Sequence, residues 1–125
     1  MSIALDLTNH ELMLFERSAP GSAWALKDHW RISNGIHKAT IPGTSKKTQF
    51  RYTNDPSKGY SCYYWSRMGS KQYMHSILYN PGTMSVQDGR LGKSISNGCV
   101  RMSLSHAKQI YYEVPEYTRV QKYYK

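Results

Sequence analysis

Short runs of β-branched and aromatic residues, interrupted by clusters of Asn, Gly, Pro and Ser, fill the first eighty positions of this chain. Such runs are typical of β-strands joined by turns, and their close spacing favours antiparallel pairing. We expect strands near residues 2–7, 11–16, 22–32, 48–53, 60–67 and 73–79. The pattern therefore predicts a mainly β fold.

A single helix is expected near the C-terminus, because only there do apolar residues recur at helical spacing. These residues are Leu104, Ala107, Ile110, Tyr111 and Val114. Ser103 is a suitable N-cap and Pro115 would end the helix, with Lys108 and Glu113 facing solvent. Residues 118–124 are predicted to form a last strand.

A cysteine directly after a glycine is the feature that indicates chemistry, in Ser96-Asn97-Gly98-Cys99-Val100-Arg101-Met102. A free thiol has a pKa of about 8.5, so a nearby base must remove its proton at neutral pH. His75, in Met74-His75-Ser76-Ile77, is our candidate, because an imidazole can accept that proton and leave a thiolate–imidazolium pair. We therefore interpret Cys99 as a nucleophile and His75 as its general base.

Four neighbouring residues are assigned supporting roles. Gly98 has no Cβ and permits a sharp turn, in which backbone N–H groups of residues 97–99 converge as an oxyanion hole. The Ser76 carbonyl is expected to accept a hydrogen bond from the far nitrogen of His75 and so fix its tautomer. The Ser96 hydroxyl would stabilise the turn. Arg101 either binds a substrate carboxylate or braces the loop through backbone carbonyls, and these two roles stay open.

Residues 92–102 resemble the signature of the L,D-transpeptidase catalytic domain, the YkuD-like family, in which Leu-Gly leads into Ser-His-Gly-Cys-Ile-Arg-Met or Leu. Leu91 and Gly92 supply that lead. The resemblance extends over most of the chain, to residues 3–7, 11–15, 33–35, 40–44, 107–112 and 118–120. By this resemblance the general base corresponds to His75, and Ser96, Asn97 and Arg101 are expected to contact substrate.

The chain departs from the family pattern in four places. Asn97 stands where the family most often has histidine, which puts a supporting role in doubt. The spacer between His75 and Ser96 is longer than usual, and we interpret the excess as an inserted loop near the cleft. Pro42 is displaced by one position and Tyr117 replaces a glycine, both away from the chemistry.

The resemblance implies a β-sandwich of mixed and antiparallel strands with one packed C-terminal helix, as a single domain over residues 1–125. It also implies acyl transfer on peptidoglycan stem peptides through a Cys99 thioester. An amine of a neighbouring stem would then form a cross-link, whereas water would make the enzyme an L,D-carboxypeptidase. Carbapenem-type β-lactams are expected to acylate the same thiol. The implied setting is the bacterial cell wall, outside the membrane, with the export segment absent from this chain.

Charge leaves a function of another class open. The net charge is +9, from 17 basic and 8 acidic residues, and eleven tyrosines accompany it. A basic, Tyr-rich surface could belong to a non-catalytic module that binds the cell wall or nucleic acid, and such binding would weaken steeply with salt. The transpeptidase interpretation, which we favour, predicts no nucleic-acid partner and a monomer.

Cysteine and histidine usage predicts two free thiols and no metal or cofactor. A bridge between Cys62 and Cys99, the only cysteines, would consume the nucleophile, so Cys62 is expected to be a small apolar residue in an aromatic strand. The remaining histidines lack ligand spacing and are taken as surface or structural: His10, His29, His37 and His106. No apolar run approaches the 18 residues that a membrane span requires.

Overall fold

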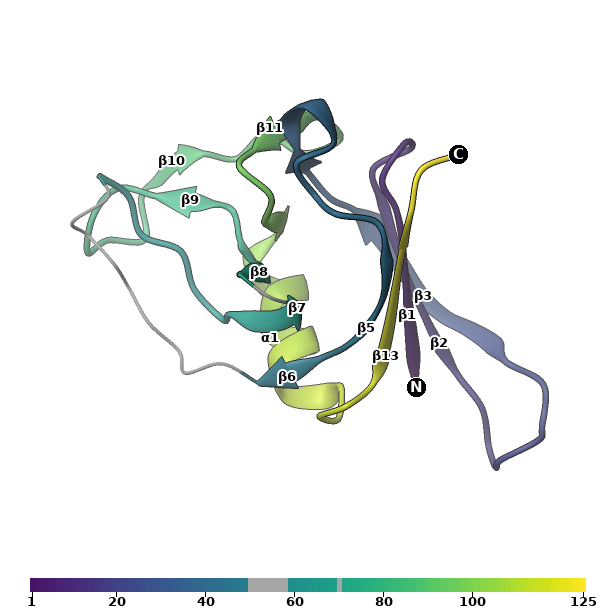
Figure 1. Ribbon diagram of the computed structural model, residues 1–125. Helices are drawn as coiled ribbons and strands as arrows, with labels where there is room; N and C mark the ends of the chain where they lie inside the picture. The colour runs from purple at the N-terminus through teal and green to yellow at the C-terminus, as the bar shows by residue number, and fades with distance from the viewer. Residues whose placement is uncertain (50–58, 70) are drawn as a thin grey trace.

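The two ends of the chain meet in a five-stranded sheet (Figure 1). Its order is β3 (Ala25–Arg31), β2 (Glu11–Glu16), β1 (Ser2–Asp6), β13 (Arg119–Tyr123) and β5 (Gly43–Lys46). β1 and β13 run parallel, and the other neighbours are antiparallel. This computed structural model describes residues 1–49, 59–69 and 71–125.

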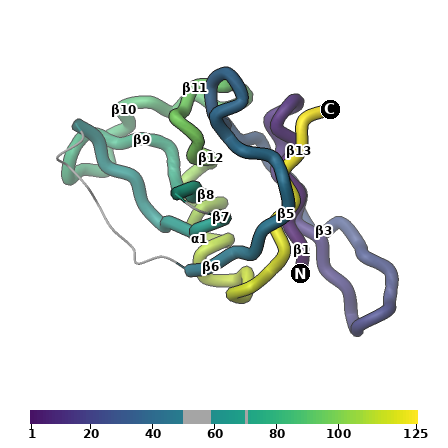
Figure 2. Tube along the Cα trace, in the orientation of Figure 1, coloured from purple at the N-terminus to yellow at the C-terminus, as the bar shows by residue number. Residues whose placement is uncertain are grey.

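A second sheet contains the segments that matter for chemistry. Its order is β12 (Val100–Met102), β8 (Gln72–Ser76), β7 (Ser66–Gly69) and β6 (Thr48–Gln49), with β12 and β8 parallel. Two short pairs complete the strands, β11 (Ser94–Ser96) with β4 (Asn34–Gly35) and β10 (Val86–Asp88) with β9 (Leu78–Tyr79). The 3₁₀ turn η1 (Ile36–Lys38) lies beside β11 (Figure 2).

The helix α1 (Leu104–Glu113) forms where the sequence predicts it. The Ser103 hydroxyl accepts from the His106 N–H at 3.3 Å and so satisfies one of the donors left open at a helix start. Ala107 and Ile110 are buried, while Lys108 and Glu113 face solvent as expected. At the other end, the buried Lys47 ammonium donates to the Val114 carbonyl at 2.9 Å, where a cation complements the helix dipole.

Both sheets and the helix contribute to one core. It includes Ile3, Leu5, Leu12 and Leu14 from the larger sheet, Met68, Met74 and Val100 from the smaller one, and Ala107 and Ile110 from the helix. Burial of the helix face therefore holds the smaller sheet, with β8 and β12, against the rest of the protein.

The predicted mainly β fold with one C-terminal helix is confirmed, but several expected strands are shorter or broken. β3 begins only at Ala25, because Ser22 closes a turn onto Ala19. The strand expected over 60–67 exists only from Ser66 onward, since Tyr64 has a φ of 56° that interrupts an extended ladder. Cys62 is buried as expected, but outside any strand.

Other predictions lie partly outside the described residues or missed a break. The strand expected over 48–53 is seen as β6, and residues 50–53 are not among those described. The run 73–79 divides at Ile77, which lies between the end of β8 at Ser76 and the start of β9 at Leu78. In the described part of the chain, no helix is long and apolar enough to cross a membrane.

We predict that replacing Ile110 by Ala destabilises the protein by about 2–5 kcal/mol, because a fully buried side chain is lost at the contact between helix and sheets. Urea unfolding measures this loss. Lys108→Ala, on the exposed face of the same helix, should change the free energy of unfolding by about 0.5 kcal/mol or less. Equal effects of the two substitutions would contradict the packing described here.

Candidate active site

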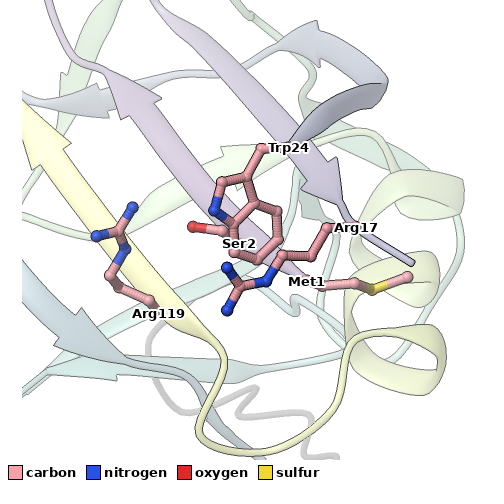
Figure 3. A pocket seen from close by; sticks show the side chains of 5 residues that line it. All are labelled: Met1, Ser2, Arg17, Trp24 and Arg119. Carbon is pink, nitrogen blue, oxygen red and sulfur yellow. The ribbon is translucent and has the colours of Figure 1, made fainter. Parts of the chain in front are cut away.

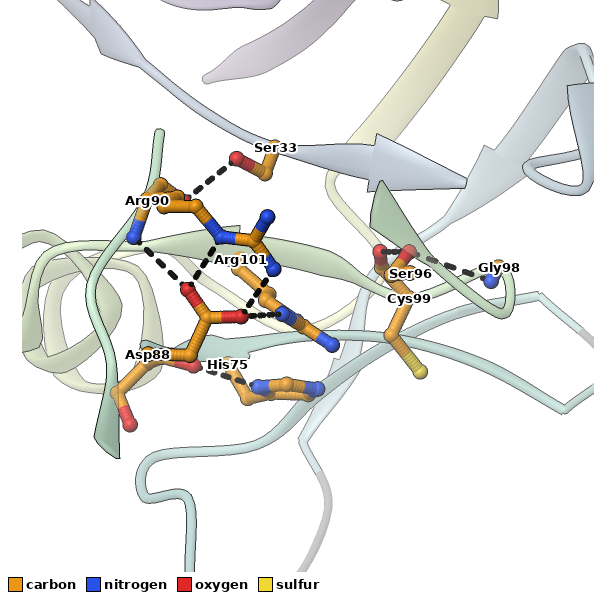
Figure 4. A network of polar contacts seen from close by, with 9 residues as sticks. Ser33, His75, Asp88, Arg90, Ser96, Gly98, Cys99 and Arg101 are labelled. Atoms are coloured by element: carbon orange, nitrogen blue, oxygen red, sulfur yellow. Dashed lines mark hydrogen bonds and ion pairs between the residues drawn. The ribbon is translucent and has the colours of Figure 1, made fainter. Parts of the chain in front are cut away.

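Parallel pairing of β8 with β12 brings the proposed nucleophile and base together. The register places Arg101 beside His75 and Val100 beside Met74, so Cys99 enters β12 next to the strand that carries the histidine. Both residues line one cavity of about 530 Å³. Figure 4 shows the Cys99 Sγ on the side of the His75 ring opposite the nitrogen that bonds to Ser76. The thiol and the free side of the imidazole therefore face the same cavity.

The turn before Cys99 is built around Gly98, whose φ of 133° favours glycine. A Cβ at this position would lie 3.2 Å from the Ala39 carbonyl oxygen. The Ser96 hydroxyl spans the turn, donating to the Cys99 carbonyl at 2.5 Å and accepting from the Gly98 N–H at 3.3 Å. The turn is therefore rigid before any substrate binds.

A second brace comes from a segment that sequence reasoning did not connect to the site. The Thr40 hydroxyl donates to the Gly98 carbonyl at 3.0 Å and accepts from the Gly35 N–H at 2.7 Å. Gly35 leaves no room for a side chain, because a Cβ there would lie 2.6 Å from the Thr40 nitrogen. The resemblance of residues 33–35 and 40–44 to the family was the only signal in the sequence for this brace. It did not indicate that these residues contact the turn before Cys99.

His75 is held in one orientation and is only 4% exposed. Its Nδ1 lies 2.7 Å from the Ser76 carbonyl oxygen, which can only accept, so Nδ1 carries the proton and Nε2 keeps its lone pair. The Ser76 hydroxyl is used elsewhere, donating to the Ile77 carbonyl and accepting from the Tyr63 N–H. Trp65 covers the imidazole, with ring centroids 4.8 Å apart. The expected Ser76–His75 contact is thus present.

Burial lowers the pKa of His75 from 6.5 to about 4. The hydrogen bond to the Ser76 carbonyl raises the pKa in part, and the positive charge of Arg101 lowers it further. The imidazole is therefore neutral at pH 7. This differs from the resting thiolate–imidazolium pair expected from sequence, because a buried cation beside an arginine is disfavoured. A neutral imidazole with its proton on Nδ1 keeps a lone pair on Nε2 that can accept a proton.

Arg101 is held by Asp88, which sequence analysis did not single out. The Arg101 guanidinium donates to the Asp88 carboxylate at 3.3 Å, and Arg90 binds the same carboxylate at 2.8 and 3.0 Å (Figure 4). The Arg90 hydrogen bond holds the pKa of Asp88 well below its usual range, although burial opposes the shift. Of the two roles left open for Arg101, the structure favours a brace, but through a carboxylate and not through backbone carbonyls.

The Asp88–Arg101 ion pair connects the segment between His75 and Ser96 to β12, the strand that follows Cys99. Asp88 ends β10, and the Ser33 hydroxyl donates to the carbonyl of Arg90 at 2.8 Å. The insertion is therefore partly ordered as a strand pair, where the sequence predicted only a loop. No spacing rule links residues 13 positions apart on different strands, so the Asp88–Arg101 contact had no sequence signal.

The cavity collects most of the predicted site residues and adds several others. It is lined by Tyr60, Trp65, Lys71, Tyr73, His75, Leu78, Ser96, Asn97, Cys99 and Arg101. Ser76 and Gly98 do not line the cavity, but they form hydrogen bonds with His75 and Ser96, which do. Cys62 is buried elsewhere, and neither cysteine is in a disulfide.

Another concavity, of about 460 Å³, lies where β1 and β13 meet the β2–β3 hairpin. Figure 3 shows Arg17 stacked over Trp24, with Arg119, Ser2 and Met1 around them. Its lining residues, as far as the structure describes them, include no thiol, imidazole or carboxylate, so they do not resemble the Cys99–His75 arrangement. The described residues also contain no cluster of three or more metal-binding side chains.

The chain matches the L,D-transpeptidase catalytic domain family (YkuD) over residues 2–121. It belongs to this family. A comparison with curated proteins gave no match. Among solved structures, the fold is similar to a fused Zn-dependent amidase/peptidase/peptidoglycan-binding domain-containing protein from Clostridium acetobutylicum, with 28% identity and a TM-score of 0.76, covering 98% of this chain and 51% of that one.

Other structures with lower identity share the fold. An L,D-transpeptidase from Stackebrandtia nassauensis is 18% identical with a TM-score of 0.68, covering 98% of this chain and 54% of that one. L,D-transpeptidase 3 from Mycobacterium tuberculosis, solved with a faropenem-derived adduct, is 18% identical with a TM-score of 0.64, covering 97% and 59%. The chain thus spans a little over half the length of these proteins.

The low pKa of His75 predicts a pH dependence of stability. Between pH 4 and 6.5 the unfolded chain binds more protons at this residue than the native protein, so the free energy of unfolding rises with pH over this range. The contribution reaches about 3 kcal/mol. Urea unfolding of the wild type and of His75→Gln at pH 4.5 and 6.5 measures it. Parallel pH dependences in the two proteins would contradict a buried neutral His75.

Proposed function

We propose that this domain is an L,D-transpeptidase that acts on peptidoglycan stem peptides through a Cys99 thioester. One observation carries the proposal: the Cys99 thiol, which is not in a disulfide, and the buried His75 imidazole with a fixed tautomer line the same cavity, at two adjacent parallel strands. Family membership adds support. The proposed setting is the bacterial cell wall, where the substrate is found.

In the first half of the reaction, Cys99 Sγ attacks the carbonyl carbon between the L-centre of a diamino acid and a terminal D-alanine. The thiol proton passes to His75 Nε2 as the S–C bond forms, since the neutral imidazole has its lone pair there. The C–N bond then breaks, and the same proton is given to the departing amine of D-alanine. The product is a thioester on Cys99 with His75 neutral again.

In the second half, the amine of a neighbouring stem attacks the thioester carbonyl and gives its proton to His75 Nε2. The C–S bond breaks, the thiol recovers its proton, and a cross-link is left. Water attacking in place of the amine would hydrolyse the same thioester, which is the L,D-carboxypeptidase reaction. Both outcomes use the same residues and differ only in the acceptor.

Backbone N–H groups of the 97–99 turn are proposed to stabilise the oxyanion. The Gly98 N–H donates to the Ser96 hydroxyl at 3.3 Å, a long bond that can be exchanged for one to a developing negative charge. Donors fixed in this way are worth about 3–4 kcal/mol of barrier each. Asn97, exposed at the cavity rim, and Ser96 are proposed to contact the substrate, while Arg101 keeps the turn and the inserted loop together.

We predict that imipenem forms a covalent adduct at Cys99, because attack of the thiol on its strained β-lactam carbonyl would open the ring. Intact-protein mass spectrometry, followed by peptide mapping, detects the adduct. The Cys99→Ala variant should give none, while Cys62→Ala, which removes the buried thiol, should be labelled like the wild type. An adduct that persists in Cys99→Ala, or is absent from the wild type, would refute the proposed nucleophile and favour a binding module.

A further inference from the structure

The cavity around Cys99 has an unbalanced positive charge. Among the residues that the structure describes, those lining it include Lys71 and Arg101 but no aspartate or glutamate, and His75 is neutral. A cavity of this composition favours an anionic substrate group.

The two cations differ in their partners. Arg101 is paired with Asp88, which lies outside the lining, and its side chain is only 13% exposed. Lys71 is exposed and forms no ion pair with any acidic side chain in the portions of the chain that are described, residues 1–49, 59–69 and 71–125. The charge available to a ligand is therefore that of Lys71.

Lys71 comes directly before β8. Tyr73 and His75 alternate along β8 and line the cavity, whereas Gln72 and Met74 do not. Lys71 lies in the turn before the strand, with a φ of 57°, and lines the cavity as well. Four residues of extended chain separate the Cα atoms of Lys71 and His75 by about 13 Å. Lys71 thus lies toward the far end of the cavity from the reacting atoms.

The wall between the two ends is aromatic. Trp65 and Tyr73 meet edge to face, with ring centroids 5.3 Å apart, and Trp65 also covers His75. Such a wall suits a chain of methylene groups that runs from the reaction centre toward a charged end.

We infer that Lys71 binds the carboxylate at the distal end of the donor's diamino acid side chain, and so selects a diamino diacid over a diamino acid without that carboxylate. This inference rests on the proposed function. The terminal carboxylate of D-alanine fits less well, because it belongs to the residue next to the scissile bond, whose Cα is only about 4 Å from its neighbour's. The side-chain carboxylate lies several bonds farther out, beyond the methylenes that the aromatic wall would contact.

The experiment uses three tetrapeptide donors that end in D-alanine: one with both carboxylates free, one with the side-chain carboxylate amidated, and one with the terminal carboxylate amidated. Lys71→Met should raise KM for the first donor by about 10- to 100-fold, the usual range for a lost charge-assisted hydrogen bond, with kcat little changed. It should leave the side-chain-amidated donor unaffected. Lys71→Arg should restore most of the affinity.

Lys108→Met is the matched control, because it removes the same charge from the exposed face of α1 and should leave KM unchanged for all donors. An equal loss on free and side-chain-amidated donors would overturn the assignment, as would a loss confined to donors with a free terminal carboxylate. The end point of imipenem labelling at Cys99 separates the two proposals. If Lys71→Met is labelled but its KM changes equally, or not at all, for the free and side-chain-amidated donors, only the Lys71 inference fails, whereas a wild type that is neither labelled nor active refutes both.

Discussion

The parallel pairing of β8 with β12 is the constraint on which the site depends. It joins residue 75 to residue 101 across a long connection, and its register sets how far Cys99 lies from His75 along the strands. A shift of one residue would turn His75 to the opposite face of the sheet. The helix stabilises this register because it follows β12 directly and packs against β8, so its buried face fixes both strands at once.

The same arrangement buries His75, the proposed base, and this burial determines its protonation state. A resting thiolate–imidazolium pair would put a cation in a nearly dry environment beside Arg101, and the low pKa of His75 reflects the cost of that cation. A neutral imidazole avoids the cost and still has the lone pair that the thiol proton needs. The Asp88 carboxylate balances the positive charge of Arg101, so that Arg101 can lie beside the neutral imidazole.

Local signals in the sequence predicted the helix and the sharp turn at Gly98 well. Ser103, the apolar spacing and Pro115 are short-range features, and Gly98-Cys99 is recognisable from adjacent residues alone. Pairings between distant segments were not predictable, because hydrophobic alternation does not state which strand lies beside which. The parallel β8–β12 pair, the Thr40 brace and the Asp88–Arg101 ion pair all belong to this class. The position of Lys71 belongs there too, because it lies in the turn before β8, where strand alternation does not set the direction of its side chain.

The separation between the two cations of the cavity also has a physical reason. An unpaired ammonium next to His75 would lower the pKa of the imidazole further and weaken it as a base. Arg101 can lie beside His75 because Asp88 balances its charge, whereas Lys71 has no such partner among the described residues and lies about 13 Å away along the strand. Over that distance, which exceeds the Debye length of about 8 Å at physiological salt, its effect on an imidazole is largely screened where solvent enters the cavity. The cavity can therefore attract a carboxylate at one end without weakening its base at the other.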